Sequence, residues 1–103
     1  MDIKDFSKYV INNISRATIG NSMNVADKLD CPNYSKFLDF TKYTYEYVVE
    51  LLKEEKASKD KCYALLTAIK TAEDKYNNDT FKYNKRFIID DLILTIWRII
   101  NGH

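Results

Sequence analysis

Apolar residues recur at steps of three and four along most of the chain, which is the spacing of one face of an α-helix. The pattern predicts a first helix over residues 2–17, with an apolar face of Ile3, Phe6, Val10, Ile14 and Ala17. Gly20 and the polar residues after it interrupt the pattern, and a short second helix is expected over 22–29. Pro32 then indicates a loop, because proline restrains the residue before it away from helical dihedrals.

Two long helices are predicted in the middle of the chain. Residues 34–56 keep the helical register, and the predicted buried face consists of Phe37, Thr41, Thr44, Tyr45, Val48, Leu51 and Leu52. Further aromatic residues lie beside this face, so the apolar surface is wider than one neighbouring helix can cover. These residues are Phe40, Tyr43 and Tyr47. Ser58 is a suitable N-cap for the next helix, over 59–76, whose predicted buried residues are Cys62, Leu65, Leu66, Ile69, Ala72 and Tyr76.

The last apolar stretch, residues 87–100, carries apolar side chains on nearly every side of a helical wheel. We expect it to be the central helix of the fold, wrapped by the others, with Asp90 and Asp91 in its first turn and Arg98 in its last. A helix of this length spans roughly 20 Å, which is shorter than the apolar core of a membrane, at about 30 Å. The stretch therefore favours a bundle core over a membrane span.

Composition supports the same fold class. The chain has 103 residues with two glycines and one proline, which disfavours a many-turned β-sandwich and suits long helices. We predict an all-α protein with a single domain over 1–103, a compact bundle of about five helices, divided into lid-like helices over 1–30 and a bundle over 34–103. The formal net charge is +1, with signs mixed along the chain, so the total charge gives no indication of nucleic-acid binding. No secretory signal precedes the first helix, and we expect a cytoplasmic protein without membrane contact.

The residue types and their spacing give little indication of a catalytic site or a metal site. Cys31 and Cys62 are the two cysteines and His103 is the one histidine, so Cys and His cannot assemble a four-ligand zinc site. We expect both thiols to be reduced. A cysteine nucleophile would need a histidine base in reach, and a terminal histidine is poorly placed for that role. Asp90 and Asp91 are neighbours and do not face each other on a helix. We predict no enzyme activity, no cofactor and no metal.

Aromatic residues provide the candidate interaction sites. Tyr43, Tyr45 and Tyr47 lie close to Lys42, and aromatic platforms beside basic groups bind single-stranded nucleic acid. Glu46 lies among them, however, so packing in the core or at a protein interface is the favoured interpretation. Trp97 is interpreted as a core anchor, with an interface hot spot as the alternative.

A weaker candidate for phosphate contact is the basic cluster before the last helix. Lys82, Lys85 and Arg86 surround Tyr83 in this segment. A solvated loop is the favoured interpretation of such a cluster, and contact with nucleic acid remains the alternative.

Almost the whole chain resembles the bacterial clamp-loader subunits of DNA polymerase III, most of all the delta-prime type. Two segments carry the likeness, and the long helix and the helix rich in Leu and Ile between them are also similar. Residues 15–29 (SRATIGNSMNVADKL) resemble the family segment in which a helix leads to a glycine and a polar residue, followed by a short helix ending in Ala and Leu. Residues 83–94 (YNKRFIIDDLIL) are similar to its closing motif, where Asn precedes a spacer, an acidic residue and an aliphatic run. The nucleotide-sensing arginine of ATP-binding relatives is not matched, because Met23 and Asn24 occupy that region.

The resemblance implies a collar domain, the helical part that holds clamp-loader subunits in a ring during DNA replication. Its expected partners are proteins, namely other clamp-loader subunits. The candidate interface residues are Tyr43, Tyr45, Tyr47 and Trp97. The alternative is a small stand-alone helical protein of phage or mobile-element origin that binds and inhibits a host enzyme or nucleic acid. The two hypotheses differ in the partner that they predict.

Overall fold

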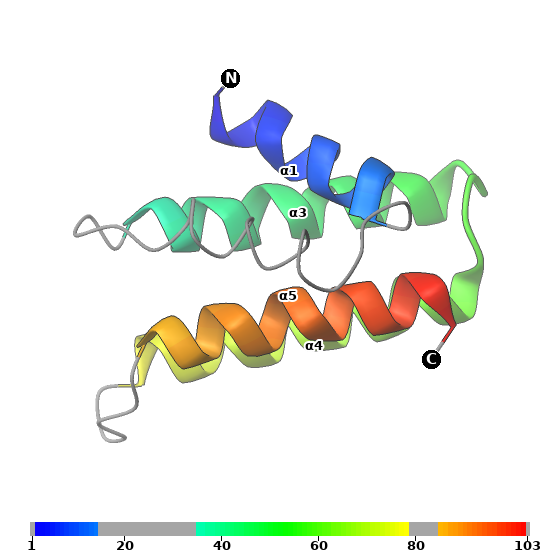
Figure 1. The fold of residues 1–103 in the computed structure, drawn as a ribbon. Helices are drawn as coiled ribbons and strands as arrows, with labels where there is room; N and C mark the ends of the chain where they lie inside the picture. The colour runs from blue at the N-terminus through cyan, green and yellow to red at the C-terminus, as the bar shows by residue number, and fades with distance from the viewer. Residues whose placement is uncertain (1, 15–34, 79–84, 103) are drawn as a thin grey trace.

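Four α-helices make up the part of the chain that the structure, a computed structural model, describes: residues 2–14, 35–78 and 85–102. They are α1 (Ile3–Asn13), α3 (Ser35–Lys53), α4 (Lys59–Asn77) and α5 (Lys85–Asn101). Helices α3, α4 and α5 run up and down as antiparallel neighbours, and α1 crosses the outer side of α3 (Figure 1). The predicted all-α bundle is confirmed. The short helix predicted over 22–29 lies outside the described residues.

Helix α1 begins with a capped first turn and docks on α3 through a small side chain and an aromatic pair. The Asp2 carboxylate accepts a hydrogen bond from the Asp5 amide at 2.8 Å, which satisfies one of the free N–H groups of the first turn. Ser7 is fully buried, and its hydroxyl donates to the Ile3 carbonyl at 2.9 Å. The Phe6 and Phe40 rings lie 6.0 Å apart between centroids. A small residue beside an aromatic pair thus lets the two helices approach closely.

The core is formed by all four helices, and most of the predicted buried positions occupy it. The most deeply buried large apolar side chains are Val10, Phe37, Phe40, Val48, Ile69, Ile89, Leu92, Ile93 and Ile96. Phe37 packs on Tyr76 with ring centroids 4.5 Å apart, which joins α3 to α4. Fully burying such side chains contributes about 1.5–3 kcal/mol each, so this cluster is the main source of stability.

The end of α3 shows how the chain turns toward α4. The Lys56 amide donates to the Leu51 carbonyl at 3.0 Å and the Glu55 amide to the Leu52 carbonyl at 3.3 Å. Glu55 has φ of 56°, the left-handed conformation that glycine adopts most easily. This pattern is a Schellman ending, with a glutamate in place of the usual glycine. The helix therefore stops at Lys53, three residues before the predicted end.

Two expectations about the last helix are wrong. Because α5 begins at Lys85, no acidic residue lies in its first turn, and Asp90 and Asp91 fall further along the helix. The helix is also not wrapped on all sides. Its inner half packs on α4 and the core, whereas Phe87, Asp91 and Arg98 are exposed along its outer half. Within the described ranges, no helix is both long enough and apolar enough to cross a membrane.

Candidate functional site

Helix α4 has a groove on each side, and these two grooves are the candidate functional sites. The first runs along the seam between α4 and α5, where two hollows of about 180 and 170 Å³ share Lys75, Ile88 and Asp91. Because they share these residues, the hollows form one continuous groove. The second groove lies between α3 and α4 and has a volume of about 440 Å³.

Small side chains create the groove between α4 and α5, which is called here the α4–α5 groove. Ala68, Thr71 and Ala72 line it from α4, and Thr95 lines it from α5. Short side chains leave the helix backbones uncovered, and a partner side chain can then approach closely. Lys75 and Asp91 bring one positive and one negative group to the middle of the groove.

One end of this groove is marked by Phe87, whose side chain is 63% exposed. Phe87 lies in the first turn of α5 and forms one wall of the smaller hollow, with Ile88 beside it. Aromatic side chains, including Phe, are enriched in the cores of protein interfaces, so an exposed ring beside an apolar hollow indicates a candidate protein-binding surface. The sequence pattern did not single out Phe87, because it was counted with the apolar surplus of a central helix.

The three candidate tyrosines do not form one patch. Residues two apart on a helix point to opposite sides, and the structure accordingly separates Tyr45 from Tyr43 and Tyr47. The Tyr47 hydroxyl donates to the Asn12 side chain at 2.8 Å, and Lys8 lies 5.6 Å from its ring centre, so Tyr47 belongs to the contact with α1. Tyr45 is 37% exposed and lines the groove between α3 and α4 instead.

The remaining predicted residues are distributed over the fold. Trp97 is half-buried on α5 and packs against the core. Lys85 and Arg86 form the first residues of α5, so the backbone of this part of the basic cluster is helical. Lys82 lies outside the described residues. Contact of this cluster with phosphate therefore stays a prediction from the sequence.

Cys62 is the cysteine that lies among the described residues. Cys62 carries a free thiol in the core, and burial raises its pKa, which favours the unreactive protonated form. Within residues 2–14, 35–78 and 85–102, no three His, Cys, Asp or Glu side chains come together as a metal site would require. Cys31 lies outside this part of the chain.

Comparisons with protein-family models, with curated proteins and with solved structures found no match for the chain. The likeness to clamp-loader subunits therefore depends on the sequence resemblance alone. Of the two segments that carry it, residues 15–29 lie outside the described residues, and residues 83–94 fall largely on α5.

Proposed function

We propose that the chain is a non-catalytic helical module that acts by binding another protein through the α4–α5 groove. The observation that carries this proposal is the exposure of Phe87 at the end of a groove lined by small residues. Its exposed ring would release water on contact with an apolar partner surface, at about 25 cal/mol per Å² of apolar area buried. The mixed charge of Lys75 and Asp91 would then set the orientation of the partner.

The specific partner that we propose is an ATPase subunit of a DNA replication clamp loader. This part of the proposal is supported by the resemblance of residues 15–29 and 83–94 to collar domains. The second of these segments contains Phe87, Ile88 and Asp91, which line the α4–α5 groove. A collar domain works by packing against sister subunits, and an exposed aromatic residue on a helix is suited to that role.

Affinity capture from a lysate of the source cell tests this proposal. We expect the purified chain to recover clamp-loader ATPase subunits, and the Phe87→Ser variant to recover at least tenfold less, which corresponds to about 1.4 kcal/mol. The matched control is Tyr63→Ser, since Tyr63 is a similarly exposed aromatic residue on α4, 58% exposed, that does not line the groove.

Two results would contradict parts of the proposal. Recovery of one unrelated enzyme without loader subunits would replace the clamp-loader hypothesis with the inhibitor hypothesis. Equal recovery by the wild type and by Phe87→Ser would show that the α4–α5 groove is not the binding surface.

A further inference from the structure

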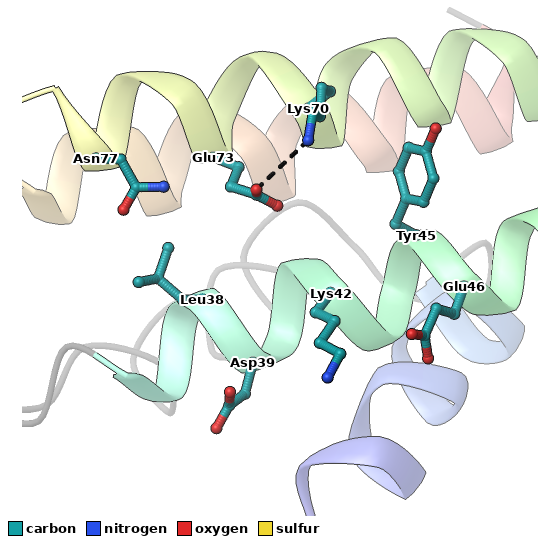
Figure 2. A pocket seen from close by; sticks show the side chains of 8 residues that line it. All are labelled: Leu38, Asp39, Lys42, Tyr45, Glu46, Lys70, Glu73 and Asn77. Atoms are coloured by element: carbon teal, nitrogen blue, oxygen red, sulfur yellow. Dashed lines mark ion pairs between the residues drawn. The ribbon is translucent and has the colours of Figure 1, made fainter.

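The groove between α3 and α4, called here the α3–α4 groove, is not used by the proposed function. Figure 2 shows Leu38 and Tyr45 directed from α3 toward α4 on either side of the gap, with Glu73 entering it from α4. The groove is thus a slot with an apolar wall at one end, an aromatic ring at the other and a carboxylate between them.

The Glu73 carboxylate is only weakly bonded. One of its oxygens lies 3.4 Å from the hydroxyl of the buried Thr41, which donates its proton to the Leu38 carbonyl at 2.8 Å, and the other lies 3.6 Å from the Lys70 ammonium (Figure 2). Both distances to the Glu73 oxygens are long for a hydrogen bond or an ion pair. The Lys70 side chain is 62% exposed, so the ion pair adds little stability. An ionised carboxylate accepts about four hydrogen bonds, which leaves acceptor capacity directed into the groove.

Charges around the groove favour a positively charged ligand. Asp39, Lys42 and Glu46 also line the groove from α3, and Figure 2 shows their side chains directed away from α4. With Glu73 and Lys70 on α4, the lining holds three carboxylates and two ammonium groups. The groove thus carries one negative charge in excess. This net negative charge attracts cations toward the groove. The preference for one kind of cation must come from the shape of the groove and from the groups that line it.

We propose that the α3–α4 groove binds the guanidinium group of an arginine side chain from a partner protein. A guanidinium presents two parallel N–H donors that match both oxygens of one carboxylate, here that of Glu73. Its planar face stacks on an aromatic ring, here that of Tyr45, and its aliphatic stem packs on an apolar side chain such as Leu38. A lysine ammonium is a point charge that lacks the planar fork, so the site selects arginine over lysine.

An NMR titration of the full chain at low ionic strength tests this inference. The probes are three short peptides that differ only in their central residue, which is arginine, lysine or citrulline, the neutral isostere of arginine. We expect saturable shift changes at the Tyr45, Glu73 and Asn77 amides with the arginine peptide. We expect binding about tenfold weaker or more for the citrulline peptide, with the lysine peptide between the two.

Two isosteric variants on neighbouring positions sharpen the test. Glu73→Gln keeps the shape of the side chain and removes its charge, and it should weaken arginine binding about tenfold. Asp74→Asn removes an exposed carboxylate from the next position of α4, outside the groove, and should leave binding unchanged. Circular dichroism confirms that both variants are folded before the titration.

Equal binding of the arginine and citrulline peptides would overturn the inference, as would wild-type affinity in Glu73→Gln. The result is independent of the α4–α5 groove, because Phe87 does not line the α3–α4 groove. A failure of the arginine titration therefore leaves the affinity-capture test of the proposed function unaffected.

Discussion

Thr44 places a hydroxyl group inside the apolar face of α3 without a hydrogen-bond partner among the described residues. Thr41, one turn earlier, is equally buried, but its hydroxyl donates to the Leu38 carbonyl at 2.8 Å. An unsatisfied buried polar group costs about 1–3 kcal/mol, whereas a satisfied one contributes about 1 kcal/mol. The two threonines therefore have opposite effects on stability although their burial is the same.

Replacing each threonine by valine tests this difference. Thr44→Val should raise the free energy of unfolding by about 1 kcal/mol, because a methyl group takes the place of an unpaired hydroxyl. Thr41→Val should lower it by about the same amount, because it removes a made hydrogen bond. Urea denaturation followed by circular dichroism measures both. A loss of stability in Thr44→Val would show that its hydroxyl is bonded in the folded protein.

For single residues, the helical periodicity predicts buried side chains more accurately than exposed ones. The periodic positions of α4 are buried as expected, apart from Leu66, which is half-buried. The periodicity predicts Tyr45 on the buried face of its helix, yet this residue lies at the edge of a groove. Its position follows from where α4 passes across α3, and a periodicity within one helix does not contain that information.

The end of α3 shows what fixes the limits of a helix. The last turn closes with Glu55 in the left-handed conformation, which costs about 1–2 kcal/mol for a residue with a side chain. Because no glycine occupies this position, the residue pattern predicts a helix that continues to Lys56. The start of α5 was also missed, because the apolar pattern begins two residues after Lys85.

Substitution of Glu55 tests the Schellman ending. Glu55→Gly should raise the free energy of unfolding by about 0.5–1 kcal/mol, since glycine adopts positive φ without a steric penalty. Lys53→Gly, in the last helical residue, is the matched control and should lower stability by up to about 1 kcal/mol. The thermal midpoints of the two variants give the comparison. A lower midpoint for Glu55→Gly would contradict the left-handed assignment.

For the whole molecule, helical periodicity and the low glycine and proline content were enough to predict an all-α bundle. They were not enough to predict the candidate sites, because both grooves arise where α4 packs between α3 and α5. The apolar side chains on nearly every side of the last helix predict complete burial of that helix. In the structure, part of this apolar surface is the exposed ring of Phe87, and the proposed protein-binding function is based on this exposure.

The most direct test of this account is site-specific photo-cross-linking in the source cell. A benzophenone-bearing phenylalanine is placed at position 87 or at position 63, which replaces an exposed aromatic residue in both cases. We predict a cross-linked adduct with one protein, a clamp-loader ATPase subunit, from position 87 and none from position 63. The same adducts from both positions, or none from position 87, would contradict a protein-binding role for the α4–α5 groove.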